Sequence, residues 1–137
     1  MFHNPSDDEI RALLQRVRRI AVVGLSPNPD RPSYGVSRFM QRMGYTIVPV
    51  RPKVGEVLGE RAYDTLSEVP DAIDLVNVFR RAEEIDPVID AAIALKVPAV
   101  WIQLGIVNEA AAERARAAGI TVVMDRCIKI EYARLCR

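Results

Sequence analysis

Five short apolar segments, each four to six residues long, alternate along the chain with segments of helical periodicity. The apolar segments are rich in Val and Ile and occupy residues 20–24, 45–50, 74–79, 99–102 and 120–124. Uninterrupted runs of this kind are typical of parallel strands that are buried on both faces. Each connection is long enough to cross over between parallel strands. The pattern predicts an α/β fold, a doubly wound parallel sheet of about five strands with helices on both faces.

The predicted helices are marked by capping residues as well as by periodicity. Ser6 and Glu9 stand three residues apart, as in a capping box, and apolar residues at helical spacing follow them as far as Val17. We therefore expect a first helix that ends near Arg18 or Arg19. Further helices are expected around residues 36–43, 85–95, 108–119 and 128–135, whereas residues 51–63 are expected to form a loop with a short turn.

Length and charge restrict the class of protein. The 137 residues suit a single domain, residues 1–137, and are too few for a dinucleotide-binding half plus a separate substrate half. A net charge of +1 creates no long-range field that favours nucleic acid or an anionic membrane. No apolar run approaches the roughly 20 residues of a membrane span, and the N-terminus lacks the pattern of a secretory signal. We therefore expect a cytoplasmic protein that binds neither nucleic acid nor membrane.

Cysteine and histidine are too few for most metal and nucleophile chemistry. The two cysteines, Cys127 and Cys136, form neither a disulfide framework nor a zinc-ligand spacing, and His3 is the only histidine. Cys127 lies near the start of the last predicted helix, beside Arg126 and Lys129, a position that favours a thiolate. Because no histidine is available as its base, we interpret Cys127 as a half-buried residue without a catalytic role. We expect no metal site.

The carboxyl ends of the predicted strands are the places to search for a ligand site, because ligands of doubly wound sheets bind there. Four segments lie at such ends and supply the candidate site residues, which are Gly24, Ser26, Arg51, Lys53, Phe79, Arg80 and Gln103. Gly24 permits a close approach to the backbone, and Ser26 offers a hydroxyl. Three prolines in residues 25–33 remove N–H donors, and the segment is not a P-loop. A rigid connection with a tight turn is the alternative interpretation of this segment.

The end of the second predicted strand carries two cations. A nicotinamide adenine dinucleotide site has an Asp or Glu near this position for the ribose hydroxyls, whereas this chain has Arg51 and Lys53. Positive charge without a carboxylate suits a phosphorylated ribose, such as the 3′-phosphate of coenzyme A (CoA) or the 2′-phosphate of NADP. A solvated basic loop is the alternative.

The third and fourth strand ends offer further candidates. Phe79 could flank an adenine or a pantetheine arm, and Arg80 could meet a phosphate, although Phe79 could equally belong to the core. Trp101 and Gln103 alternate along the fourth predicted strand and share one face if the strand is regular. We interpret Trp101 as a core residue and Gln103, which is polar and emerges at a strand end, as the better site candidate.

Six short motifs, taken in order, resemble the small bacterial CoA-binding protein family. They are IAVVGLS (20–26), GY (44–45) followed by VPV (48–50), LGE (58–60), DLV (74–76) with VFR (78–80), VWIQLG (100–105) and DRCIKIE (125–131). The resemblance covers nearly the whole chain, and it extends to the CoA-binding domain of succinyl-CoA synthetase α-subunits. One position departs from the usual family pattern, since Arg51 stands where the family has Asn.

The resemblance implies a Rossmann-like domain that holds CoA at the carboxyl ends of its strands. It implies that Gly24 and Ser26 come from the loop after the first strand and that Lys53 meets the phosphate end. It also implies that the strand ends near Phe79 and Gln103 close the site. The phosphohistidine and nucleotide-grasp portions of the synthetase have no counterpart in these motifs, so its ligase activity is not implied.

The sequence thus predicts a module that binds CoA or acyl-CoA and is not an enzyme, acting as a carrier, a sensor or a partner-binding domain. CoA is the expected cofactor. A small NADP-dependent oxidoreductase is the alternative, although we find no second domain and no acid suited to hydride transfer. A purely structural interaction module with an empty cleft is the third hypothesis.

Overall fold

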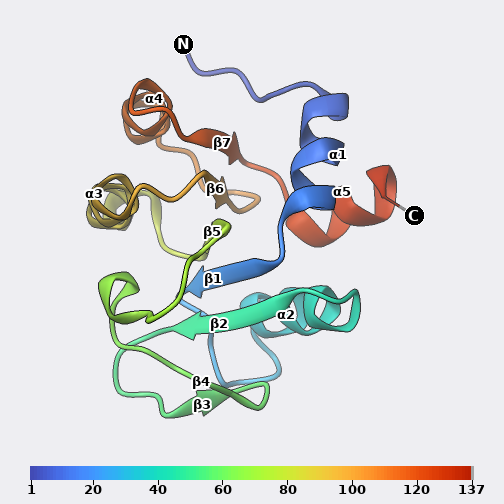
Figure 1. The fold of residues 1–137 in the computed structure, drawn as a ribbon, viewed down its shortest axis with the longest axis vertical. Coiled ribbons are helices and arrows are strands. Elements are labelled where there is room, and N and C mark those ends of the chain that lie inside the picture. Colours follow the sequence, from blue (N-terminus) through green and yellow to red (C-terminus); the bar gives the residue numbers. More distant parts are fainter. Residues whose placement is uncertain (137) are drawn as a thin grey trace.

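A parallel sheet of five strands forms the centre of the protein, which the computed structural model describes over residues 1–136 (Figure 1). The strands are β1 (Arg19–Val23), β2 (Thr46–Val50), β5 (Leu75–Val78), β6 (Ala99–Ile102) and β7 (Thr121–Met124). They lie in the order β2-β1-β5-β6-β7, and every pairing is parallel. This confirms the predicted doubly wound, Rossmann-like sheet. The chain adds β2 on one side of β1 and β5 on the other, so the switch point lies between the carboxyl ends of β1 and β5.

Helices cover both faces of the sheet, as predicted (Figure 1). One face carries α1 (Asp7–Arg16), α2 (Pro32–Arg42) and α5 (Ile128–Leu135), and the other carries α3 (Ile85–Leu95) and α4 (Glu109–Ala117). Successive side chains of each strand enter opposite layers, because side chains alternate across a strand. Among residues 1–136, no helix combines the length and the apolar character needed to cross a bilayer.

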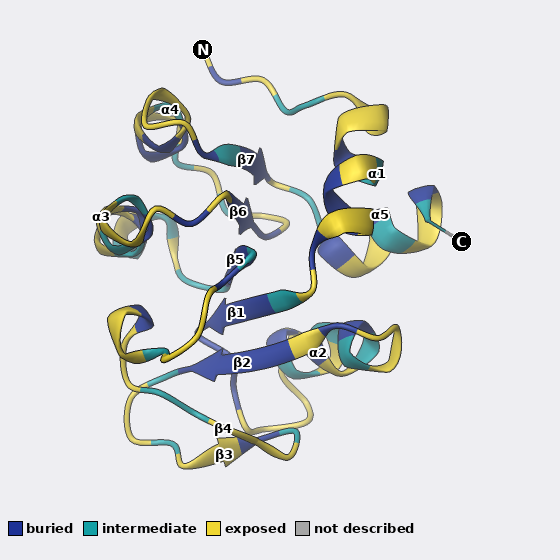
Figure 2. Cartoon of the chain, viewed as in Figure 1, coloured by how far each residue is buried: buried dark blue, intermediate teal, exposed yellow. Residues whose placement is uncertain are grey.

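The strands are buried along almost their whole length (Figure 2). Trp101 of β6 is fully buried, and its indole Nε1 donates to the carbonyl oxygen of Arg126 at 2.9 Å. The prediction that Trp101 is a core residue is therefore confirmed. The sheet is a rigid base from which the loops at its carboxyl edge project.

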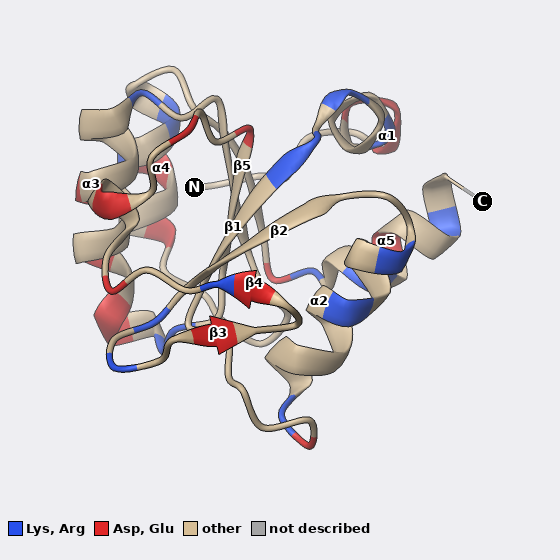
Figure 3. Cartoon of the chain, turned by 60° about the horizontal axis from the view of Figure 1, so that its bottom comes forward, with Lys and Arg blue, Asp and Glu red and all other residues tan. Residues whose placement is uncertain are grey.

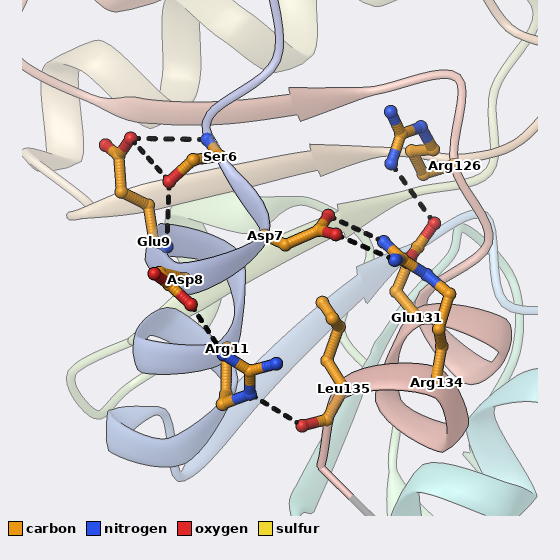
Figure 4. Close-up of polar contacts among 9 residues, drawn as sticks. All are labelled: Ser6, Asp7, Asp8, Glu9, Arg11, Arg126, Glu131, Arg134 and Leu135. Carbon is orange, nitrogen blue, oxygen red and sulfur yellow. Dashed lines mark hydrogen bonds and ion pairs between the residues drawn. The ribbon is translucent and has the colours of Figure 1, made fainter.

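The first helix is shorter than the sequence predicts. Its capping box forms as expected (Figure 4), but α1 ends at Arg16, before the predicted end near Arg18 or Arg19. The backbone N–H groups of Arg18 and Arg19 both donate to the carboxylate of Asp74, each at 2.9 Å. This contact joins residues more than 50 positions apart and draws the chain out of the helix into β1.

The predicted loop after β2 contains a small antiparallel hairpin, β3 (Glu56–Val57) and β4 (Glu60–Arg61). Its two turn residues, Leu58 and Gly59, have φ of 56° and 77°. Positive φ at both positions matches the type I′ turns that connect tight hairpins. Leucine is unusual in this conformation, and here its carbonyl oxygen accepts a hydrogen bond from Nε2 of Gln41 at 3.0 Å.

A network of ion pairs surrounds Glu131 of α5 and links α5 to α1 through Arg134 and Asp7 (Figure 4). Arg134 pairs with Asp7 at 2.8 Å and with Glu131 at 2.6 Å, and Arg126 pairs with Glu131 at 3.2 Å. The side chain of Glu131 is only 7% exposed. Two guanidinium groups therefore compensate a carboxylate that would be costly to bury alone.

Candidate functional site

A cavity of about 340 Å³ opens at the switch point of the sheet. Gly24, directly after β1, and Phe79, directly after β5, both line it. The rest of the lining comes from the loop between β1 and α2, the start of α2, the residue after β2, the chain after β5 and the loop after β6, namely Ser26, Arg31, Pro32, Ser33, Arg51, Arg80, Arg81 and Ile106. The structure thus brings together five of the seven predicted site residues, Gly24, Ser26, Arg51, Phe79 and Arg80.

Gly24 joins the ends of three strands. Its N–H donates to the carbonyl of Val50 at 2.9 Å, and the N–H of Phe79 donates to the carbonyl of Val23 at 2.9 Å. Gly24 has φ of +89°, and a Cβ added to it would overlap the Phe79 carbonyl oxygen and lie 3.2 Å from the carbonyl carbon. The group that closely approaches Gly24 is therefore the backbone carbonyl of Phe79, at the edge of the cavity.

Backbone N–H groups of the loop from β1 to α2 donate to acceptors in the same loop or in the first turn of α2. Ser26 N–H donates to Ser33 Oγ at 3.0 Å, Asn28 N–H donates to Ser26 Oγ at 3.1 Å, and Arg31 N–H donates to the Asn28 carbonyl at 3.0 Å. These bonds agree with the expectation that the loop offers no backbone cradle for a phosphate. The hydroxyls of Ser26 and Ser33 act only as acceptors within the described residues. Their O–H groups can therefore donate to a ligand in the cavity.

Four arginines line the cavity, and its lining, as described, includes no carboxylate and no imidazole. Arg81 pairs with Glu84 at 2.9 Å, and this hydrogen bond raises the pKa of the Arg81 guanidinium. Arg31, Arg51 and Arg80 form no ion pair within residues 1–136, and the only hydrogen bond of the Arg51 guanidinium among these residues is a 3.4 Å contact with the Gly24 carbonyl. Basic residues (blue) lie on the loops at the ends of β1 and β2 in Figure 3. Arginines that line a cavity without forming an ion pair favour an anionic ligand.

A second, larger cavity of about 480 Å³ adjoins the first, and Arg80 lines both. Its apolar lining residues are Val23, Val50, Leu66, Pro87, Val88 and Ala91, and its polar ones are Asp64, Thr65, Ser67, Glu83 and Glu84. The carboxyl ends of β1 and β2 form part of its floor, through Val23 and Val50. A ligand with a charged part and a flat apolar part could thus occupy both cavities.

A cavity of about 290 Å³ at the amino edge of the sheet has a different character. It is lined in part by Leu14, Tyr45 and Tyr132. The Tyr45 hydroxyl donates to the Leu14 carbonyl, and burial raises the pKa of Tyr45 to about 12. The phenol therefore stays neutral and serves as a packing contact between α1 and β2.

Two predicted site residues do not line either cavity. Gln103 is 3% exposed, and its side-chain Nε2 donates to Oδ1 of Asn77 at 2.7 Å in the interior. Lys53 is exposed with φ of 62°, and its N–H donates to the carboxylate of Asp64 at 3.3 Å. Lys53 follows the second strand, as the sequence indicates, but it lines neither cavity.

Five residues of the cavity lining are absent from the predicted site, namely Arg31, Pro32, Ser33, Arg81 and Ile106. Ser33 lies in the first turn of α2, and its pairing with Ser26 could only have been suspected from two serines in one loop. Arg31 is the N-cap of α2, directly before Pro32 at the first helical position. Proline is common at this position, so it is the sequence signal for a helix start here. Ile106 carries no sequence signal for a ligand site.

Cys127 stands apart from this cavity. It is the N-cap residue of α5, is half-buried, and makes no side-chain capping bond. Among residues 1–136, no group of three or more His, Cys, Asp or Glu side chains has the arrangement of a metal site.

Known proteins resemble this chain along nearly its full length. Residues 18–133 match a protein family described as a CoA binding domain. The chain is 48% identical over 132 residues to YneT of Bacillus subtilis (strain 168), an uncharacterized protein, and this match covers 96% of the chain and 98% of YneT.

Solved structures agree with the fold. A Thermus thermophilus protein is 35% identical with a TM-score of 0.92, covering 96% of this chain and 99% of that one. A hypothetical protein from Pyrococcus horikoshii OT3 is 33% identical with a TM-score of 0.94, covering 100% and 99%. A dinucleotide-forming acetyl-coenzyme A synthetase of Ca. Korarchaeum cryptofilum shares the fold alone, at 24% identity and a TM-score of 0.69 over 78% of this chain and 26% of that one. From the matched residues, the chain belongs to the CoA binding domain family.

Proposed function

We propose that the protein binds CoA, free or acylated, across the carboxyl edge of the sheet and acts as a carrier, a sensor or a partner-binding module without catalysing a reaction. The observation that carries the proposal is the cavity at the switch point, where Arg31, Arg51 and Arg80 have no carboxylate partner among the described residues. CoA has a 3′-phosphate and a diphosphate, so a cationic lining with two free hydroxyl groups fits it. Membership of the CoA binding domain family agrees with this ligand.

The proposed path of CoA crosses four strand ends. Its adenosine 3′-phosphate lies near Arg51, with Lys53 at the rim, and its diphosphate meets the hydroxyls of Ser26 and Ser33. The adenine base enters the larger cavity, whose apolar residues suit a flat ring. The pantetheine arm then runs past Phe79 toward the loop after β6. Neighbouring strands are about 4.8 Å apart, so β2 and β6 are separated by roughly 14 Å, a span suited to an extended arm.

Two observations support a binding role without catalysis. The described lining of the cavity at the switch point contains no histidine, cysteine or carboxylate that could act as a general base or nucleophile. Cys127, whose position in the sequence favours a thiolate, lies outside this lining. The proposal includes a cytoplasmic location, in keeping with Cys127 and Cys136 as free thiols.

Calorimetric titration with CoA, dephospho-CoA, NADP and NAD tests the proposal. We expect CoA to bind most tightly, and Arg51→Gln to weaken its binding. Arg42→Gln, an exposed arginine in the last turn of α2 and away from both cavities, is the matched control and should bind CoA normally. Tighter binding of NADP than of CoA would overturn the proposal in favour of a nicotinamide enzyme. Failure of all four to bind would leave the cavity as part of a structural module.

The absence of catalysis needs its own measurement. Release of free CoA from acetyl-CoA should proceed no faster with the protein than in buffer alone. Thioester cleavage that saturates with acetyl-CoA would show an enzyme.

A further inference from the structure

The loop after β6 presents large apolar side chains to solvent at the carboxyl edge of the sheet. Leu104 is 60% exposed and Val107 is 50% exposed, while Ile106 between them is half-buried and lines the cationic cavity. Single exposed apolar residues are ordinary on a protein surface. Here two of them flank a residue that already belongs to the candidate site.

The loop is held in place by hydrogen bonds, so these exposures are fixed by the fold. Ile106 N–H donates to the Gln103 carbonyl at 3.1 Å, and Gly105, with φ of +86°, donates its N–H to the Asp125 carboxylate at 2.7 Å. Two residues beyond Ile106, Nδ2 of Asn108 donates to the carbonyl of Ala82 at 3.0 Å. A rigid apolar surface loses little conformational entropy when a ligand covers it.

Charge divides the carboxyl edge into two halves. The loops after β1, β2 and β5 contribute Arg31, Arg51 and Arg80 to the cavity lining, which has no carboxylate, whereas residues 101–108 include no charged side chain. The nearest charges of the loop after β7 are already engaged, since Asp125 accepts from Gly105 and Arg126 pairs with Glu131. The edge is therefore cationic at one end and apolar at the other.

We propose that the preferred ligand is an acyl-CoA with an aliphatic acyl chain, which lies on Leu104 and Val107. This inference rests on the proposed binding of CoA and adds the class of its acyl group. The polarity of the edge matches that of such a thioester, anionic at the adenosine phosphates and apolar at the opposite end. An acyl chain on this loop continues directly from a pantetheine arm that passes Ile106.

The size of the effect follows from the area that a chain can bury. A methylene fully removed from water raises affinity about fourfold, and one covered on a single side gains about half of that free energy, or roughly twofold. Octanoyl-CoA has six methylenes more than acetyl-CoA, so it should bind about 60-fold more tightly.

Calorimetry with CoA, acetyl-CoA, butyryl-CoA and octanoyl-CoA tests this inference. Affinity should rise with chain length, and Leu104→Ser or Val107→Ser should each lower octanoyl-CoA affinity by roughly fivefold while CoA affinity stays within about twofold. Leu95→Ser is the matched control, because Leu95 is 42% exposed at the far end of α3 and should change nothing.

The outcomes separate this inference from the proposed function. Normal CoA binding with the same affinity for all four ligands would overturn the acyl-chain assignment and leave the loop as a surface for a protein partner. Equal losses of CoA and octanoyl-CoA affinity in Leu104→Ser would also overturn it, since the loop would then act on the shared part of the ligand. Failure of CoA itself to bind would overturn the proposed function.

Discussion

Replacing Gly24 by alanine should destabilise the protein, because the backbone of Phe79 after β5 lies against Gly24 after β1. Gly24 has φ of +89°, a conformation that costs an L-residue about 1–2 kcal/mol. The new Cβ would also overlap the carbonyl oxygen of Phe79. That carbonyl cannot move freely, because the N–H of Phe79 is bonded to Val23 at 2.9 Å. The overlap should add about 1–3 kcal/mol, as in other overpacked interiors.

Gly119 provides the matched control for this substitution. Its φ is +90°, almost the same as that of Gly24, but a Cβ added there would meet nothing within 4 Å. Gly119→Ala should therefore pay only the conformational cost of about 1–2 kcal/mol. The difference between the two variants isolates the overlap with Phe79.

Urea unfolding followed by far-ultraviolet circular dichroism measures both variants. We expect Gly24→Ala to have the lower midpoint, with a slope m equal to that of the parent protein, so that the change reports stability alone. At about 3–6 °C per kcal/mol for a domain of this size, the overlap of about 1–3 kcal/mol should make Gly24→Ala melt roughly 3–18 °C below Gly119→Ala. Equal losses in the two variants would refute the argument, because the close approach of Gly24 to Phe79 would then contribute nothing.

Three further predictions concern the charges and the thiol. CoA should bind about ten- to hundredfold more tightly than dephospho-CoA. Titration should show that this affinity ratio falls toward one in Arg51→Gln and changes less in Lys53→Gln. Equal affinity of the parent protein for both ligands would refute the assignment of the 3′-phosphate. The hydrogen bond from Arg134 lowers the pKa of Asp7, so the pair stabilises the fold above the ordinary pKa of 3.8 and the contribution disappears as the pH falls through the lowered value. Unfolding curves at several pH values should therefore show Asp7→Asn less stable than Asp8→Asn at neutral pH and the gap closing in acid; a gap that persists would contradict the ion-pair account. Cys127→Ser should bind CoA normally under reducing conditions and gain about 0.5–1 kcal/mol, since serine is a better N-cap; a large loss of affinity in a folded variant would make the thiol a site residue.

Much of the fold was predictable because its signals are local. Apolar runs of four to six residues predicted all five strands of the main sheet, and residues 99–102 coincide with β6. The capping box of α1 and the Asn108 cap of α4 formed as capping rules predict, with Asn108 Oδ1 accepting from Ala111 N–H at 3.1 Å. Each of these features depends on residues within a few positions of one another.

The errors in the fold have nonlocal causes. The end of α1 depends on Asp74, which lies more than 50 residues away and binds the N–H groups of Arg18 and Arg19. The hairpin depends on Leu58 adopting a positive φ, and an Asn or Gly at this position would have predicted the turn. The contact from Gln41 that accompanies this conformation comes from another element, α2.

The candidate site was predictable at the level of strand ends but not of individual side chains. The topology rule places Gly24, Arg51 and Phe79 at one edge, and the structure gathers them around one cavity. Which side chains enter that cavity depends on hydrogen bonds between elements. The bond between Ser26 and Ser33 is an example, because it closes a loop whose ends belong to β1 and α2.

Gln103 shows why residue type alone could not settle the site. A polar side chain at a strand end is a reasonable ligand contact, but Asn77 of the neighbouring strand offers it a buried partner at 2.7 Å. Either amide left alone in the sheet would incur a desolvation cost of about 1–3 kcal/mol, so the two side chains satisfy each other. The Gln103 carbonyl meanwhile accepts from Ile106 N–H and fixes the turn that brings Ile106 to the cavity. The structure therefore buries the Gln103 side chain beneath the carboxyl edge of the sheet, and its backbone carbonyl supports the loop that carries Ile106.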